Sequence, residues 1–153
     1  MTATHWLPAI AAMLMAPALS GQTPAQRQEV QDFVRAYADA ANRGDVTAYT
    51  EMYSRRADLI TVNDGTILRG WEALRTQANE TLGMEGSYKI SVGTIDVATI
   101  GTTRAIAVFP FAMTVTTDQG PVQLRGAMTL VVEKGAQGWR IIHDHTSTQP
   151  ATQ

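Results

Sequence analysis

The sequence predicts an α+β fold, a cone in which three helices from the N-terminal half pack on the concave side of a curved antiparallel sheet. Before residue 83, apolar residues recur at spacings of three and four, which is typical of helices with one buried face. After it, apolar and polar residues alternate through long segments separated by turns, which is typical of strands. Long strands with bulges curl, so the sheet is expected to leave a concave side for the helices.

Caps and apolar stripes define the helices. Thr23 and Pro24 provide an N-cap and a first-turn proline, and an apolar stripe continues from them until the first helix ends at Gly44. Asp45 caps a short second helix. The third helix is predicted over residues 71–82, between two glycines.

The remaining elements are strands. Residues 59–68 are expected to form a hairpin around the turn sequence Asn63-Asp64-Gly65. Gly93 interrupts an alternating pattern and Pro110 lacks an N–H group, so each favours a bulge or an edge position. The longer strands are predicted over residues 88–97, 104–117, 122–133 and 138–147.

The chain has 153 residues, which is enough for one domain with a buried core. We expect this domain to span residues 21–148 and residues 149–153 to form a loose polar tail. There is no cysteine, so packing must stabilise the fold. A net charge of -2 without a basic run argues against binding of nucleic acid.

Residues 1–20 predict a signal peptide. Their apolar run is too short for a permanent membrane-spanning helix, and Ala18 and Ser20 are the small residues that signal peptidase requires. We therefore expect a periplasmic or secreted protein without a stable membrane span. No Lys or Arg precedes the apolar run, so a mis-assigned start codon or an unstructured leader is the alternative interpretation.

The last strand is expected to form the wall of a pocket. Side chains alternate along a strand, which places Trp139, Ile141, His143, His145 and Ser147 on one face. That face changes from apolar to hydrogen-bonding along a single line. It therefore suits a cavity that is apolar at one end and polar at the other.

The order of these elements resembles the nuclear transport factor 2-like superfamily, in particular its SnoaL-like branch. The matching segments are residues 41–45 (Ala-Asn-Arg-Gly-Asp), residues 69–75 (Arg-Gly-Trp-Glu-Ala-Leu-Arg) and residues 138–147, and the resemblance covers about residues 23–147. Members of this superfamily include isomerases, dehydratases, cyclases, hydrolases and non-catalytic binding or assembly domains. The resemblance therefore implies a pocket without implying one reaction.

His143 and His145 are the leading catalytic candidates. Two imidazoles at a pocket could act as acid, base or hydrogen-bond donor near neutral pH. The alternative is that they satisfy neighbouring backbone groups. A His-x-His pair can also chelate a metal, but no third ligand is fixed by the sequence, so we expect no metal and no cofactor.

Tyr37 is the third catalytic candidate. The resemblance to the ketosteroid isomerase branch would place an oxyanion-stabilising tyrosine at this position, where a buried phenol could donate to a substrate oxygen. That branch also uses a carboxylate base in the first strand, and the ungapped count from Gly44 puts Thr61 there instead. The alternative is that Tyr37 belongs to the helix core.

Four further residues are candidates for contacting a substrate. If a five-residue loop pairs Glu133 with Trp139, then Thr129 faces His143 and Arg125 faces Ser147, and both reach the polar end of the pocket. A register shifted by one residue would send both to the other face, where Arg125 would be an exposed charge. Trp71 and Tyr53 would line the apolar side, although aromatic residues at this spacing also form ordinary core.

These observations predict an exported pocket protein that binds a small molecule. It could be a cofactor-independent acid–base enzyme of the isomerase, dehydratase or hydrolase type that acts on an apolar, oxygen-bearing substrate. The alternative is a non-catalytic ligand-binding or dimerisation module of the same fold. We expect a homodimer formed through the exposed side of the sheet, where Val108, Val115 and Val131 are predicted to lie.

Overall fold

The computed structural model describes residues 23–82 and 88–151. The predicted signal peptide, residues 1–20, lies outside the described residues. In chain order the elements are α1 (Pro24–Asn42), α2 (Val46–Glu51), β1 (Ile60–Asn63), β2 (Thr66–Arg69), α3 (Trp71–Leu82), β3 (Tyr88–Val92), β4 (Asp96–Ile100), β5 (Arg104–Thr117), β6 (Gly120–Gly135) and β7 (Gly138–Pro150).

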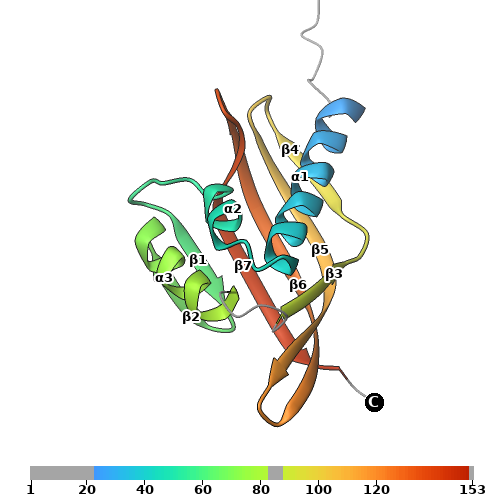
Figure 1. Ribbon diagram of the computed structural model, residues 1–153. Coiled ribbons are helices and arrows are strands. Elements are labelled where there is room, and N and C mark those ends of the chain that lie inside the picture. The colour runs from blue at the N-terminus through green and yellow to red at the C-terminus, as the bar shows by residue number, and fades with distance from the viewer. Residues whose placement is uncertain (1–22, 83–87, 152–153) are drawn as a thin grey trace, which may run out of the picture.

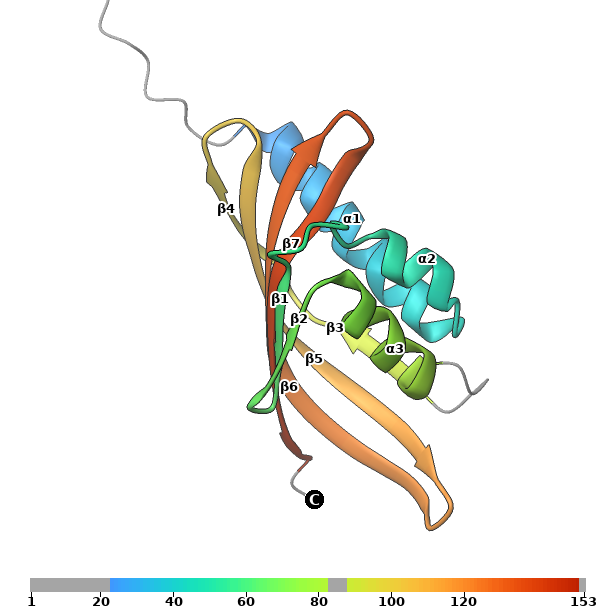
Figure 2. The ribbon, with the colours of Figure 1, turned by 90° about the vertical axis from the view of Figure 1, so that its left-hand side faces the viewer.

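One curved sheet carries all the helices on a single side. Its strands are ordered β2-β1-β7-β6-β5-β3, and β4 also pairs with β5. The neighbours are antiparallel except β1 and β7, which run parallel. Figures 1 and 2 show α1, α2 and α3 on the concave side, which we call the inner face, while no helix covers the opposite, outer face. The predicted fold class is confirmed.

The predicted caps at the starts of α1 and α2, and the glycine between these helices, are confirmed. The Thr23 hydroxyl accepts a hydrogen bond from the Gln26 amide at 3.2 Å, and the Asp45 carboxylate accepts one from the Ala48 amide at 2.9 Å. Between the two helices, Gly44 has a φ of 64° and leaves only 3.0 Å between its would-be Cβ and the Leu82 carbonyl oxygen. A side chain there would strain the chain and crowd the end of α3.

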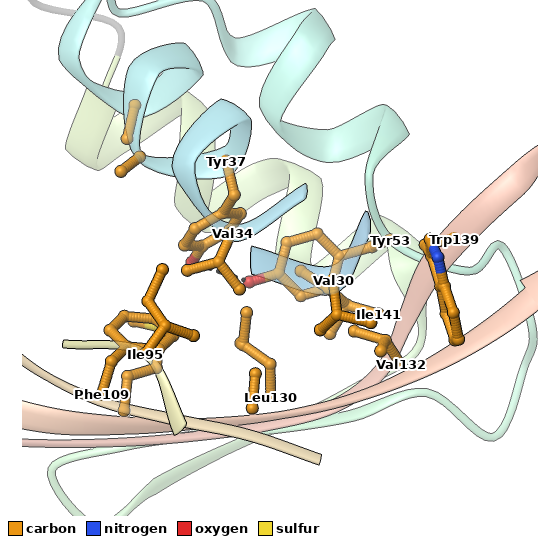
Figure 3. Close-up of a cluster of buried hydrophobic side chains, with 14 of the residues drawn as sticks. Val30, Val34, Tyr37, Tyr53, Ile95, Phe109, Leu130, Val132, Trp139 and Ile141 are labelled. Atoms are coloured by element: carbon orange, nitrogen blue, oxygen red, sulfur yellow. Dashed lines mark hydrogen bonds between the residues drawn. The ribbon is translucent and has the colours of Figure 1, made fainter. Parts of the chain in front are cut away.

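The core lies between α1 and the inner face. Figure 3 shows its upper layer, with Val30 and Val34 from α1 above Leu130 and Val132 of β6. Asn42 joins the end of α1 to the sheet edge, because its side-chain amide donates to the Ile90 carbonyl at 2.9 Å and its carbonyl accepts from the Ile90 amide at 2.7 Å. The helices are thereby held against a defined part of the sheet.

A bulge in β7 changes which residues face inward. Val132 pairs with Ile141, but the preceding residue, Val131, pairs with His143, so Ile142 is an extra residue on β7. Ile141 and Asp144 are both buried, whereas strict alternation would place them on opposite faces. The predicted alternation is therefore correct up to Ile141 and wrong beyond it.

Gly93 and Pro110 mark a second irregularity. The predicted strand over residues 88–97 is divided into β3 and β4, and both pieces pair with β5. Pro110 lies opposite the break, where its carbonyl accepts a hydrogen bond from the Gly93 amide at 2.9 Å. Proline has no N–H group to donate. Because Pro110 lies opposite the break between β3 and β4, no strand residue there loses a hydrogen bond to it.

The predicted loose tail is wrong in part, because β7 continues through Pro150. Its last residues pair with Leu124 and Arg125 of β6, and the Ala151 amide donates to the Gln123 carbonyl at 3.1 Å. Backbone pairing with β6 thus extends β7 into a segment whose polar composition had predicted a loose tail. In the part of the chain that the structure describes, no helix is long and apolar enough to cross a membrane.

Candidate functional site

A cavity of about 380 Å³ opens between the helices and the lower part of the inner face. The lining combines apolar side chains of β5, β6 and α3 with hydroxyl, amide and carboxyl groups from several elements. Such a mixture suits a small molecule that is largely apolar and carries a few polar atoms. The lining residues are Tyr37, Tyr49, Tyr53, Thr61, Asn63, Asp64, Leu74, Gln77, Glu80, Thr81, Leu82, Phe111, Met113, Val115, Thr116, Leu124, Met128, Asp144, Thr146 and Thr148.

Three tyrosine hydroxyls meet at the inner end of this cavity. Tyr37 comes from α1, Tyr49 from α2 and Tyr53 from the segment after α2, and together they form the tyrosine cluster. The Tyr37 hydroxyl oxygen lies 2.8 Å from that of Tyr49 and 3.1 Å from that of Tyr53. Figure 3 shows Tyr37 and Tyr53 above the sheet with their hydroxyl groups directed toward the space between them.

Asp144 of β7 completes the cluster. The Tyr53 hydroxyl donates a hydrogen bond to its Oδ2 atom at 2.6 Å, and the Asp144 side chain is buried. Burial raises the pKa of Asp144 above that of an ordinary aspartate, and the hydrogen bond from Tyr53 opposes part of this shift. The site therefore contains a carboxyl group that takes up a proton more readily than a surface aspartate.

The tyrosines remain protonated donors. Burial raises the pKa of Tyr37 and of Tyr53 well above the usual tyrosine value, and the charge of Asp144 adds to both shifts. An ionised Asp144 can only accept hydrogen bonds, so it orients the Tyr53 proton toward itself. A protonated Asp144 can also donate a hydrogen bond. The network can then donate one hydrogen bond to an accepting oxygen of a ligand.

The β1–β2 turn forms part of the cavity wall through Asp64. This residue has a φ of 45° and is fixed to β7, because its carboxylate accepts hydrogen bonds from the Thr148 amide at 2.6 Å and the Thr148 hydroxyl at 2.5 Å. Glu80, near the end of α3, lines the cavity with an exposed side chain. The wall thus carries carboxyl groups from three separate elements.

Tyr37 and Tyr53 lie where the sequence predicted them, on the cavity wall. Trp71 does not: its ring packs against the guanidinium groups of Arg55 and Arg75, at 4.6 and 5.7 Å, and its indole N–H donates to the Thr50 carbonyl at 3.0 Å. The expectation that Trp71 lines the pocket is therefore wrong, because these contacts hold its ring away from the cavity lining.

His143 and His145 do not face the cavity, contrary to expectation. The bulge at Ile142 turns them to the outer face, where His145 is exposed and the His143 Nδ1 atom lies 2.9 Å from the Ile60 carbonyl oxygen. The latter contact matches the alternative interpretation that a histidine satisfies a backbone group. A role for either imidazole inside the pocket is not compatible with this arrangement.

Arg125 and Thr129 are also on the outer face. The loop before β7 has two residues in place of the five expected, because Gly135 pairs with Gly138. Thr129 consequently pairs with His145 and Arg125 with Gln149, so neither reaches the cavity. Their predicted role depended on pairing of Glu133 with Trp139, and this condition is not met because Glu133 pairs with Arg140.

Asp144 is the functional residue that sequence reasoning missed. The signal that could have found it is the adjacent pair Ile141 and Ile142, because two consecutive apolar residues allow a strand to change face. Asp144 pairs with Thr61 across the parallel contact of β1 and β7. The carboxyl group sought in the first strand is thus supplied by the neighbouring strand.

Metal coordination finds little support in this site. Within residues 23–82 and 88–151, no three His, Asp or Glu side chains are close enough to hold an ion together. The polar groups that do converge are phenols and one carboxyl, which is a set suited to hydrogen bonding and proton transfer.

Solved structures share this fold at low sequence identity. A nuclear transport factor 2-like protein of unknown function from Shewanella oneidensis MR-1 has a TM-score of 0.69 and 24% identity, covering 79% of this chain and 98% of that one. A nuclear transport factor 2-like superfamily protein from Salmonella enterica serovar Typhimurium LT2 has a TM-score of 0.69 and 21% identity, with 82% and 92% covered. The association domain of C. elegans CaMKII has a TM-score of 0.67 and 18% identity, with 80% and 95% covered.

No curated protein matches the chain at a significant level. The model of the SnoaL-like domain matches residues 30–152, which include α1 from Val30 onward, α2, α3, the strands of the sheet and every residue of the tyrosine cluster. The chain therefore belongs to the SnoaL-like family, and it shares its fold with the nuclear transport factor 2-like proteins named above.

Proposed function

We propose that this protein binds an apolar, oxygen-bearing small molecule in the cavity and acts on it by acid–base chemistry without a cofactor. One observation carries the proposal: a buried carboxyl group, hydrogen-bonded to a cluster of tyrosine hydroxyls, lies on the wall of a cavity of about 380 Å³. Burial raises the pKa of this carboxyl group, which makes it a better proton acceptor than a surface aspartate and lets it both take and return a proton during a reaction.

The proposed chemistry is of the isomerase, dehydratase or hydrolase type. In the simplest case the Asp144 carboxylate removes a proton from a carbon next to a carbonyl group. The electron pair moves onto the carbonyl oxygen, which a hydroxyl of the tyrosine cluster stabilises by a hydrogen bond. The protonated Asp144 then returns the proton to another carbon of the same molecule, so no oxidant or reductant is needed.

The proposed place of action is outside the cytoplasm. The short apolar run that ends at Ala18 and Ser20 supports export. Detection of a mature N-terminus at Gly21 by mass spectrometry of the protein from its native host would test this part. An unprocessed chain in the cytoplasmic fraction would contradict it.

The ligand can be identified directly. The protein is purified from its native host, and any small molecule that is released on denaturation is identified by mass spectrometry. We expect an apolar molecule with at least one carbonyl or hydroxyl oxygen. The released molecule then serves as substrate for the wild type and for Asp144→Asn, which is expected to turn it over about 10² to 10⁴ times more slowly.

Glu72→Gln is the matched control, because Glu72 is an exposed carboxylate on α3 that pairs with Arg75 and does not line the cavity. Its turnover is expected to equal that of the wild type. Unchanged turnover in Asp144→Asn would contradict the catalytic role. Turnover lost equally in Glu72→Gln would show that the loss reflects folding.

The second candidate function is non-catalytic association through the outer face. No helix covers this face, and its side chains Ile60, Ile67 and Val108 are 39, 50 and 42% exposed. Val131 pairs with His143 on the same face, whereas Val115, which was also expected there, lines the cavity. The similarity to a structure called an association domain is consistent with this candidate.

Sedimentation analysis tests association. We expect a dimer for the wild type and a monomer for Val108→Asp, since a buried unpaired charge opposes contact between two such faces. A monomeric wild type would contradict the proposed dimer. Ligand binding in the monomeric variant would show that the cavity works without a partner.

A further inference from the structure

The cavity has an uneven distribution of charge. Carboxyl groups lie on its wall at Asp144 of β7, at Asp64 of the β1–β2 turn and at Glu80 of α3. Among the lining residues that the structure describes, none is Lys, Arg or His. The carboxyl groups of the wall are therefore not balanced by a cationic side chain among these lining residues.

The carboxyl groups are held on different sides of the cavity. Asp144 is fixed at the inner end by the Tyr53 hydroxyl at 2.6 Å, and Asp64 is fixed by the backbone and side chain of Thr148. Glu80 belongs to a helix that packs over the sheet. Concave walls of low polarity concentrate the field of such groups, so their effect is larger than on an open surface.

The other polar groups of the lining are hydroxyls and side-chain amides, which carry no positive charge to compensate an anion. The tyrosine hydroxyls already donate to one another and to Asp144, and Thr148 donates its hydroxyl and its amide to Asp64. An anionic group bound to the remaining donors, such as the amides of Asn63 and Gln77, would still give up its water beside carboxylates. An uncharged oxygen needs only one donor from the tyrosine cluster, which a network with a protonated Asp144 can supply.

We propose that the part of a ligand that enters the cavity is uncharged and that carboxylates and phosphates are rejected. This inference rests on the proposed function of the cavity. The substrate class is thereby restricted to neutral carbonyl compounds and alcohols. Fatty acids, acyl phosphates and organic acids with the same carbon skeleton are excluded by the charge of the wall rather than by its shape.

A matched pair of probes tests the proposal. 2-Naphthamide and 2-naphthoate have nearly the same shape, and at neutral pH the first is uncharged while the second is an anion. Their affinities for the wild-type protein are measured by fluorescence titration at low ionic strength. We expect 2-naphthoate to bind at least about tenfold more weakly than 2-naphthamide.

Two variants locate the cause of the difference. Glu80→Gln removes one exposed charge from the wall and should reduce the ratio of the two dissociation constants about two- to threefold. Glu72→Gln removes a charge from the same helix outside the cavity and should leave the ratio unchanged. An unchanged ratio in Glu80→Gln, or an equal reduction in Glu72→Gln, would overturn the assignment of selectivity to the wall.

The outcomes separate this inference from the proposed function. Equal or tighter binding of 2-naphthoate overturns the inference and leaves the cavity as a ligand site. Failure of both probes to bind, at concentrations up to their solubility, counts against the cavity as a site for apolar molecules and against the inference with it. Binding of 2-naphthamide alone, with the expected response to Glu80→Gln, supports both.

Discussion

The two faces of the sheet use neighbouring residues of β7 for opposite purposes. Asp144 is buried on the inner face and bonded to the tyrosine cluster, whereas His143 and His145, on either side of it, lie on the outer face. One extra residue, Ile142, decides this assignment. The comparison teaches that the more conspicuous titratable groups of a strand need not be the ones that its pocket uses.

The faces also differ in how strongly they constrain their residues. The inner face is packed against helices, so its side chains have fixed partners and a change of volume or polarity is costly. The outer face has no helix against it, and substitutions there should cost little unless another molecule covers it. Four experiments test this contrast, from the largest expected effect to the smallest.

Replacement of Gly126 by alanine should give the largest effect. A Cβ atom on Gly126 would overlap the carbonyl oxygen of Ser147 and lie 2.7 Å from the Phe111 ring, and the backbone oxygen cannot move away. We expect the free energy of unfolding, measured with urea, to fall by about 3 kcal/mol or more. The control is Ala127→Val on the exposed outer face, where a loss below about 0.5 kcal/mol is expected. Equal effects of the two changes would remove the contrast between the faces.

Tyr53→Phe should have the second largest effect. It removes the hydroxyl that donates to Asp144 and leaves a buried carboxyl without this partner. We expect a loss of about 1 to 3 kcal/mol in the free energy of unfolding. Because the hydrogen bond lowers the pKa of Asp144, the pKa of that group should rise further in the variant. A fully stable variant would show that Asp144 finds another donor.

The pH dependence of stability should reveal Asp144. Burial raises its pKa in the folded protein, so the folded state binds the proton more tightly than the unfolded state does. The pKa of an aspartate in an unfolded chain is about 3.9, and the pKa of Asp144 in the folded protein is higher. As pH rises from the first pKa to the second, this group makes the free energy of unfolding fall, by at most about 1.4 kcal/mol per pH unit.

Asp144→Asn lacks this contribution. Urea unfolding of both proteins across a series of pH values gives the difference in free energy of unfolding, wild type minus variant. This difference should fall as pH rises from the unfolded-state pKa to the folded-state pKa of Asp144, and it should become constant above the folded-state pKa. A difference that rises with pH would mean that hydrogen bonds to the carboxylate outweigh its burial and that the pKa of Asp144 is lowered.

His145→Ala should have the smallest effect. The imidazole is exposed on the outer face and does not line the cavity, so the free energy of unfolding should change by less than about 0.5 kcal/mol. Binding of an uncharged probe such as 2-naphthamide should also be unchanged. A large loss of binding would place His145 in the site after all and would contradict the register of β7.

Features that depend on local chemistry were predictable from the sequence. The caps at Thr23 and Asp45 and the helix over residues 71–82 follow from neighbouring residues, and the structure confirms them. The order of elements was sufficient to identify the fold, because apolar spacings of three and four indicate helices and alternation of apolar and polar residues indicates strands. Tyr37 was placed correctly because helical periodicity assigns it to the buried stripe.

Features that depend on pairing between strands were not predictable. The two-residue turn between Gly135 and Gly138 and the bulge at Ile142 together shift the pairing of β6 with the polar half of β7. Each is a property of two strands at once, and a shift of one residue exchanges the two faces. Arg125, Thr129, His143 and His145 were therefore assigned to the wrong side, and Asp144 was missed.

The hydrogen bond between Tyr53 and Asp144 joins residues that are 91 positions apart in the chain. During synthesis the three phenols emerge long before the carboxyl group that orders them, because β7 is the last strand to form. A chain that has not yet added this strand has no finished chamber to offer a small molecule. The cavity is therefore complete only after β7 has been synthesised and has paired with β1 and β6.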